Sequence, residues 1–172
     1  MELKKHNTKK KWYQLLRRGI FTAIVVHSAQ EVGENCKVNH YSKVTKNTVL
    51  ANNVSFNGMR ITGKGKVSIG QYFHSGEDCL MITDTHNYEG TMIPYDATDR
   101  VRNIIIDDFV WLGSRVTILG GVCIGEGAII QAGAVVVHDI PAYAIAGGNP
   151  ATVFKYRDKE HFVELKNKGA YF

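Results

Sequence analysis

Hydrophobic residues recur every six positions in the stretch that begins at Ile106. Cut into sixes, this stretch reads IDDFVW, LGSRVT, ILGGVC, IGEGAI, IQAGAV and VVHDIP. The first position of each six is a large aliphatic residue, and the fifth is valine, alanine or isoleucine. Position five of one six and position one of the next lie two residues apart, so their side chains share one face of a strand. The pattern therefore predicts a solenoid of short parallel β-strands with these positions facing inward.

A weaker form of the same period covers residues 57–86 and reads NGMRIT, GKGKVS, IGQYFH, SGEDCL and MITDTH. The fifth positions, predicted to face inward, are Ile61, Val67, Phe73, Cys79 and Thr85. The two stretches are out of register, because Met81 and Ile106 stand 25 residues apart, one more than a multiple of six. We therefore predict that a loop leaves the solenoid over residues 87–105. His86 is then the last residue before the loop, with its side chain facing outward.

The two ends of the chain depart from the repeat. Residues 1–35 open with a basic segment and are predicted to form a helical arm, and the solenoid is predicted over residues 36–157. The tail DKEHFVELKNKG has hydrophobic residues at helical spacing after a candidate N-cap, Asp158. A short C-terminal helix is therefore predicted over residues 158–172.

The positive charge of the chain is concentrated in the arm. The formal net charge is +5, and residues 1–18 contain seven basic residues against one acidic residue, Glu2. The rest of the chain is nearly neutral, which argues against a body built to bind nucleic acid. The apolar run at residues 20–26 is too short to span a bilayer. Two interpretations of the arm remain open: a helix that touches a membrane surface or a partner, and a helix that is solvated or packed.

The cysteines indicate a reducing compartment. Cys36, Cys79 and Cys123 are odd in number, widely spaced and without a CxxC pair, so neither a disulfide framework nor a zinc knuckle is predicted. We therefore expect a cytoplasmic protein. If the arm binds lipid, the protein would sit peripherally at the inner face of the membrane.

Two sets of outward-facing residues are candidates for function. His86 stands beside the predicted loop, and a neutral imidazole on a rigid scaffold can act as a general base, although a plain surface histidine fits the same position. The outward sixth positions of the regular stretch are unusually apolar: Trp111, Thr117, Cys123, Ile129 and Val135. Exposed apolar strips are typical of interfaces and ligand grooves. We expect a subunit contact here, with a cofactor groove along part of its edge.

Two segments carry a resemblance to a known family: TDTHNYEGTMIPYD, and IIIDDFVWLGSRVTILGGVCIGEGAIIQAGAVVVHDIPAYAIAGGNPA downstream of it. Over roughly residues 57–157 the chain resembles the hexapeptide-repeat acyltransferases, in particular xenobiotic, maltose, galactoside and surface-polysaccharide acetyltransferases. The resemblance implies an all-β, left-handed parallel β-helix. It also implies transfer of acetyl from acetyl-CoA, without a metal, to a sugar hydroxyl in surface-polysaccharide (capsule or O-antigen) synthesis. A homotrimer is implied as well, because the family assembles its active site from two chains.

The resemblance implies roles for the residues around the break in the repeat. His86 would be the base that takes a proton from the acceptor, and Asp84, two residues earlier, would orient it. The backbone N–H of Ser114 in the WLGS motif would stabilise the oxyanion. The residues implied to contact a sugar or glycan acceptor are Asn87, Tyr88 and Tyr95.

Acetyl-CoA would lie in a groove between neighbouring copies. The residues implied to contact it are Trp111, Ser114, Ala132, His138, Lys155 and Arg157. Ala132 belongs to the AGA segment that meets the pantetheine arm, while Lys155 and Arg157 are available to the CoA phosphates. His138 departs from the family pattern, because many members carry lysine before DIP.

Three other functions compete with this one. An N-acetyltransferase acting on a nucleotide-linked amino sugar or an antibiotic would use the same fold and cofactor. The loop at 87–105 and the C-terminal segment are shorter than in the antibiotic-modifying members, which favours the sugar hydroxyl. A hexapeptide-repeat carbonic anhydrase needs a close pair of zinc-binding histidines, and the histidines at positions 6, 27, 40, 74, 86, 138 and 161 include none. A scaffold that only binds partners would not depend on His86.

Overall fold

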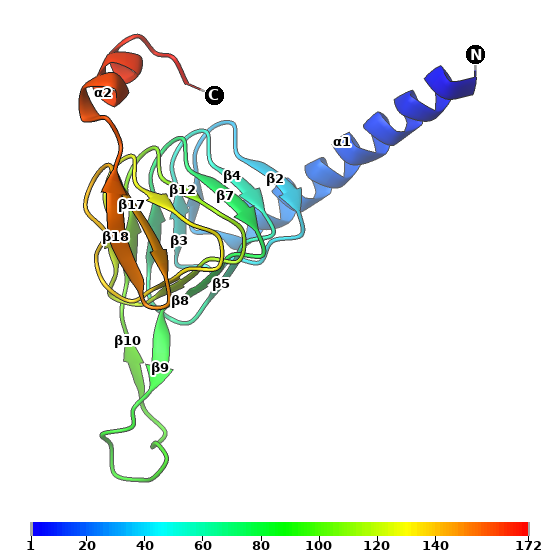
Figure 1. Cartoon of the computed structure of the whole chain (residues 1–172). Helices are drawn as coiled ribbons and strands as arrows, with labels where there is room; N and C mark the ends of the chain where they lie inside the picture. Colours follow the sequence, from blue (N-terminus) through cyan, green and yellow to red (C-terminus); the bar gives the residue numbers. More distant parts are fainter. Residues whose placement is uncertain (1, 172) are drawn as a thin grey trace.

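The structure, a computed structural model, describes residues 2–171 of the chain and the side chains from residue 12 to residue 171 (Figure 1). Its body is a β-solenoid of about six turns, which confirms the predicted architecture. Helix α1 (Glu2–Ser28) leaves one end of the solenoid, and helix α2 (Lys159–Asn167) lies at the other end. The first strand, β1, begins at Glu31, so the solenoid starts before residue 36.

The strands of successive turns stack into three faces, here called A, B and C. Face A contains β1 (Glu31–Val32), β3 (Thr48–Leu50), β6 (Val67–Ile69), β11 (Ile104–Ile106) and β14 (Cys123–Ile124). Face B contains β2 (Lys37–His40), β4 (Ser55–Asn57), β7 (His74–Glu77), β12 (Trp111–Leu112), β15 (Ile129–Ile130), β17 (Ala144–Gly148) and β18 (Ala151–Tyr156). Face C contains β5 (Arg60–Thr62), β8 (Leu80–Ile82), β13 (Thr117–Leu119) and β16 (Val135–Val136). All neighbours pair in parallel except β18, which returns antiparallel along β17.

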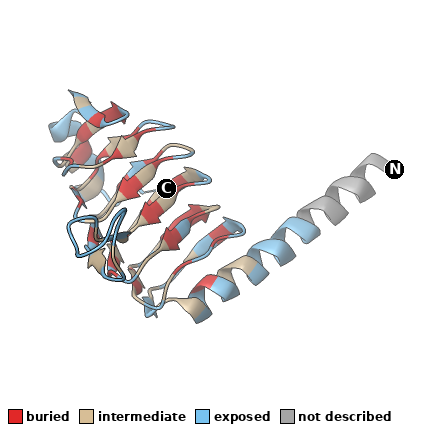
Figure 2. Ribbon diagram, turned by 90° about the horizontal axis from the view of Figure 1, so that it is seen from below, coloured by how far each residue is buried: buried red, intermediate tan, exposed pale blue. Residues whose placement is uncertain are grey.

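The core of the solenoid consists of the inward positions of the repeat. From Ile106 onward, every first and fifth position of the six sixes is at most 4% exposed. Figure 2 shows these buried residues running from turn to turn through the strands. Because burying one aliphatic side chain contributes about 1.5–3 kcal/mol, a stack of such residues can hold together strands of only two or three residues. In the earlier stretch Ile61, Val67, Phe73 and Cys79 are buried as predicted, whereas Thr85 is exposed.

The excursion from the solenoid is an antiparallel hairpin formed by β9 (Asp84–His86) and β10 (Asp99–Val101). Leu80 pairs with Thr117, 37 residues later, whereas Thr117 pairs with Val135, 18 residues later, so the excursion adds 19 residues to one turn. That is the length predicted for residues 87–105.

The point at which the hairpin leaves the solenoid was predicted wrongly. Thr83 is fully buried at the corner between faces C and A, where its Oγ1 donates to the carbonyl of Thr62 (3.0 Å). The N–H of Arg102 donates to the carbonyl of Thr83 (2.8 Å) and closes the neck of the hairpin. His86 therefore lies on the hairpin and not on the last strand of the solenoid. The register of the repeat determines the length of an insertion but not its point of exit.

The corner between faces A and B carries a stack of aromatic residues. Tyr72, Phe109 and Tyr143 each have a positive φ, between 56° and 63°, a conformation that is uncommon for bulky residues. The rings of Tyr72 and Phe109 stack with centroids 5.1 Å apart. The C-terminal segment covers them, since Phe162 contacts Phe109 and Tyr143, and Tyr171 contacts Tyr72 and Phe109. We call this set the aromatic corner; its packing offsets the backbone strain and anchors α2.

The start of α2 follows the predicted cap. Oδ1 of Asp158 accepts a hydrogen bond from the N–H of His161 (3.0 Å). This bond satisfies one of the amide donors that a helix leaves free in its first turn.

Candidate active site

His86 is held on the hairpin by two neighbours. The antiparallel register places His86 directly opposite Asp99, and Nδ1 of His86 lies 3.3 Å from Oδ1 of Asp99. The ring of Tyr95 stacks on the imidazole, with centroids 4.0 Å apart and planes 12° from parallel. The side chain of His86 is nevertheless 61% exposed. The imidazole is thus oriented and still accessible to a reactant.

The carboxylate of Asp99 is kept ionised by Lys64. Nζ of Lys64 donates to Oδ2 of Asp99, and this hydrogen bond, together with the charge of Lys64, lowers the pKa of Asp99 below its usual 3.8. An ionised carboxylate only accepts hydrogen bonds, so Nδ1 of a neutral His86 carries the proton that points to Asp99. Nε2 of His86 then presents a lone pair. An imidazole in this tautomer can accept a proton at Nε2.

Asp84 does not orient His86. Register places Asp84 opposite Val101, and its Oδ2 accepts the backbone N–H of Lys64 (3.0 Å). Asp84 therefore holds the neck of the hairpin, and Asp99 takes the place that the sequence suggested for Asp84. Asp99 was missed because it meets His86 only through the pairing of the hairpin strands, which no local spacing reveals.

The three predicted acceptor contacts separate into two groups. The side chain of Asn87 is engaged inside the hairpin: Nδ2 donates to Oγ1 of Thr98 (3.1 Å), and Oδ1 accepts from Nε of Arg100 (3.0 Å). Asn87 therefore supports the hairpin with its side-chain amide. Tyr88 lies under the guanidinium of Arg100, 4.6 Å from the ring centroid, and is exposed, as is Tyr95.

Ser114 and Ala132 lie on neighbouring turns at the corner between faces B and C. They stack closely, because a Cβ placed on Gly113 would stand 2.5 Å from the amide nitrogen of Ala132. Oγ of Ser114 accepts the N–H of Glu77 (3.1 Å), while its own N–H has no hydrogen-bond acceptor among the residues described. The hairpin of His86 rises from a different corner, between faces C and A. A single chain therefore does not bring Ser114 and His86 together.

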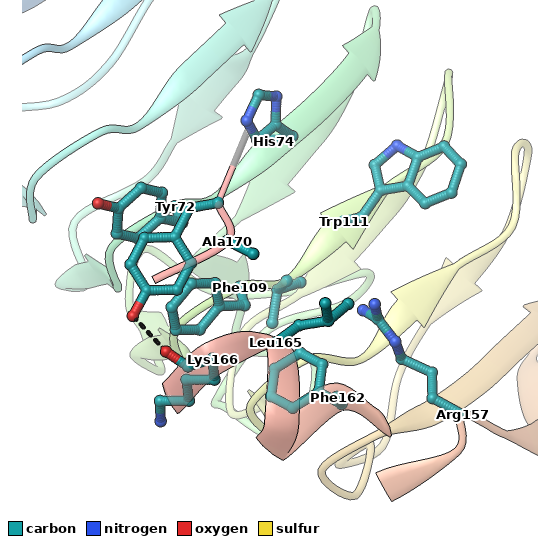
Figure 3. A pocket seen from close by; sticks show the side chains of 11 residues that line it. Tyr72, His74, Phe109, Trp111, Arg157, Phe162, Leu165, Lys166 and Ala170 are labelled. Atoms are coloured by element: carbon teal, nitrogen blue, oxygen red, sulfur yellow. Dashed lines mark hydrogen bonds between the residues drawn. The ribbon is translucent and has the colours of Figure 1, made fainter. Parts of the chain in front are cut away.

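Trp111 and Arg157 line a groove of about 470 Å³ between face B and the C-terminal segment (Figure 3). Trp111 is 54% exposed and pairs with His74 on the adjacent strand. The guanidinium of Arg157 donates to the carbonyl of Gly127 (3.1 Å), and burial lowers its pKa. Arg157 is thus partly committed to the fold.

The remaining predicted cofactor residues lie elsewhere on the solenoid. Lys155 is exposed on β18, opposite Ile145 of β17. His138 is exposed just after β16, on the side of the corner between faces C and A. The six predicted cofactor residues therefore do not form one site within a single chain. Among the described side chains, no cluster of histidine, cysteine and carboxylate groups is placed to hold a metal ion.

Comparison with known sequences finds relatives of the regular repeat among acetyltransferases. The family described as Bacterial transferase hexapeptide (six repeats) matches residues 103–138. A chloramphenicol acetyltransferase from Klebsiella aerogenes is 39% identical over 70 residues, which make up 41% of this chain and 33% of that protein. A 2,3,4,5-tetrahydropyridine-2,6-dicarboxylate N-acetyltransferase from Staphylococcus aureus (strain JH9) is 50% identical over 52 residues, 30% of this chain and 22% of that protein. The chain thus spans a third or less of the length of these curated relatives.

The fold is also similar to that of solved acetyltransferases. A galactoside acetyltransferase in complex with coenzyme A superimposes with a TM-score of 0.63 at 25% identity, covering 76% of this chain and 67% of that one. The six-residue repeat, the β-solenoid and these comparisons agree: residues 103–138 match the bacterial transferase hexapeptide repeat, and the fold is similar to that of solved acetyltransferases.

Proposed function

We propose that this protein transfers the acetyl group of acetyl-CoA to a hydroxyl group of a sugar or glycan, in the synthesis of a surface polysaccharide such as capsule or O-antigen. The observation that carries the proposal is the accessible imidazole of His86, with Nδ1 3.3 Å from Oδ1 of Asp99. A sugar hydroxyl is a weak nucleophile until its proton begins to leave, so such a transfer needs a positioned base. Similarity to a galactoside acetyltransferase supports the choice of a sugar acceptor.

His86 acts as the general base in the proposed reaction. Its Nε2 takes the proton of the acceptor hydroxyl while the hydroxyl oxygen forms a bond to the carbonyl carbon of the thioester. The carbonyl electron pair moves onto oxygen and gives a tetrahedral oxyanion. When the C=O bond forms again, the C–S bond breaks, and the imidazolium of His86 returns the proton to the departing thiolate. Asp99 stabilises the imidazolium while it carries the extra proton.

The oxyanion requires a donor that one chain does not place near His86. The backbone N–H of Ser114 is available, but it lies at the other edge of face C. We therefore propose a homotrimer, in which the corner that carries Ser114 in one copy faces the hairpin of its neighbour. A monomer would contain the base and the oxyanion donor in separate places.

The corner that carries Ser114 suits the pantetheine arm of acetyl-CoA. Ala132 and Gly133 are exposed there, and a Cβ on Gly133 would meet no atom within 4 Å, so an extended chain can approach the backbone. When bound, acetyl-CoA supplies the activated acetyl group. Lys155 is free to meet its phosphates, whereas Arg157 is less suited because its guanidinium already donates to Gly127.

Replacing Ser114 with alanine is expected to leave kcat within about threefold of the wild type, because any residue except proline supplies the proposed N–H. The substitution removes the hydrogen bond from the N–H of Glu77, so a stability loss of about 1 kcal/mol is expected. Steady-state kinetics and thermal unfolding measure the two effects. A loss of kcat by two orders of magnitude would show that the hydroxyl itself takes part.

The test of the proposed function is thiol release from acetyl-CoA by the purified protein. The acceptors are sugars, amino sugars and their nucleotide-linked forms, with a no-acceptor control for hydrolysis. We expect release with hydroxyl acceptors and acetyl esters among the products. If no acceptor raises release above hydrolysis, the proposal fails.

A second candidate is transfer to an amine, on a nucleotide-linked amino sugar or an antibiotic. It is favoured by the 50% identity to an N-acetyltransferase over 52 residues. The chemistry at His86 would be the same, because an attacking amine must also lose a proton. Products decide between the two: an alkali-stable amide formed only from amino acceptors establishes the second candidate and excludes the first.

A further inference from the structure

Helix α1 has one face that packs on the solenoid. Val25 is fully buried, and Phe21, four residues earlier, packs against the same core. Oγ1 of Thr22 accepts the N–H of Val38 in β2 (3.1 Å). These contacts attach the C-terminal half of α1 to the first turn of the solenoid. The N-terminal half extends away from it (Figure 1).

The opposite face of α1 carries a ridge of exposed apolar residues. Trp12, Leu16, Ile20 and Ile24 follow one another at intervals of four, so they lie along one side of the helix. They are 66%, 47%, 52% and 36% exposed. Leu15, Val26 and Tyr13 flank the ridge and are also exposed. Within the described part of the chain nothing covers this side, which we call the α1 ridge, defined by Trp12, Leu16, Ile20 and Ile24.

The charge of the chain is gathered on the same helix. Residues 1–28 contain seven basic residues and one acidic residue, while the other 144 residues carry 14 basic and 15 acidic groups. Arg17 lies over the rings of Tyr13 and Phe21, with its guanidinium carbon 5.7 Å and 5.5 Å from the two centroids. An apolar ridge that begins with a Trp side chain, with Tyr13 and Arg17 beside it on a basic helix, has the composition of helices that lie in a membrane interface.

We propose that α1 docks the protein on an anionic lipid surface. The helix lies flat, with the α1 ridge among the upper acyl chains and with Arg17, at the border of the ridge, reaching the headgroups. No helix in the described part of the chain is long and apolar enough to cross a bilayer, so the contact is peripheral. Charge favours lipid over a second copy, because two α1 helices packed side by side would bring net positive charges together.

The experiment is co-sedimentation of the full-length protein with vesicles. One set contains phosphatidylglycerol and phosphatidylcholine in equal parts, and the other contains phosphatidylcholine alone. We expect binding to the anionic set to be at least tenfold stronger and to weaken in high salt. Arg17→Gln should weaken it about fivefold. Leu16→Ser together with Ile20→Ser should weaken it at least tenfold.

The matched control is Phe154→Ser, which removes an equally exposed apolar side chain (55%) from β18. Its binding to vesicles should equal that of the wild type, and circular dichroism should show that every variant keeps its fold. Equal binding to both vesicle sets, or unchanged binding in the Leu16→Ser and Ile20→Ser double variant, overturns the proposal. The same holds if that double variant changes only the oligomeric mass measured by light scattering, because the α1 ridge would then contact another copy.

Discussion

Replacing His86 with alanine is expected to lower kcat about a thousandfold, because a positioned general base contributes about 10²–10⁴ to the rate. The side chain lies on an exposed hairpin, so the solenoid should remain folded. Its ring stacks on Tyr95, which is an exposed side chain of the same excursion. Steady-state kinetics with the best acceptor from the thiol-release assay measures the effect.

The control for His86 is His161→Ala. This histidine is exposed on α2, and only its backbone N–H takes part in the helix cap. Its replacement should leave kcat and KM unchanged. If His86→Ala retained full activity in a folded protein, the imidazole would be an ordinary surface group and the proposed mechanism would be wrong.

Replacing Asp99 with asparagine is expected to lower kcat about a hundredfold while KM for both substrates changes by less than about twofold. The neutral amide no longer stabilises the imidazolium, and its NH₂ group can donate to Nδ1 and move the proton to Nε2, the wrong tautomer for a base. Because Lys64 lowers the pKa of Asp99, the wild-type carboxylate is ionised at the pH of the assay. The comparison therefore measures the loss of a charged partner.

Asp84→Asn is the matched control for Asp99. Both carboxylates lie in the hairpin and both bond to Lys64. Asp84 accepts the backbone N–H of Lys64, whereas Asp99 accepts from its Nζ and is the partner of His86. We expect Asp84→Asn to keep kcat within about threefold. Equal losses of kcat in the two variants would indicate that both substitutions only destabilise the hairpin. Asp99 would then have no specific role in orienting His86. Loss of the Lys64–Asp99 pair should cost little stability, since Lys64 is 69% exposed.

The regular part of the fold could be predicted because each residue position has one environment. In a six-residue repeat, Leu112 and Ile118 occupy equivalent inward positions on successive faces of one turn, so the residue type at that position indicates burial directly. The length of the excursion followed from the same periodicity. Thr85 broke the pattern because the chain had already left the solenoid at Thr83, whose hydroxyl replaces an apolar group at the corner by bonding to Thr62.

The candidate site could be predicted only in part. His86 was identified from its position and motif, but its partner depends on how β9 pairs with β10, and a hairpin register is a tertiary property. The separation of His86 and Ser114 depends on which corner each occupies. The aromatic corner was not predicted either, since bulky residues at positive φ are tolerated there only through packing with the C-terminal segment.

The hairpin divides its tasks between a stem and a tip. The stem holds the imidazole of His86 beside Asp99 and is tied to the solenoid at Thr83 and Arg102. The tip is closed by Asp96, whose carboxylate accepts hydrogen bonds from the N–H groups of Thr91 and Thr98. The side chains of Met92 and Ile93 at the tip are exposed. Substitutions of Met92 and Ile93 can therefore accumulate without disturbing the imidazole of His86. In the proposed reaction, such a division allows the substrate range to diverge during evolution, or to be re-engineered, while the chemistry is inherited unchanged.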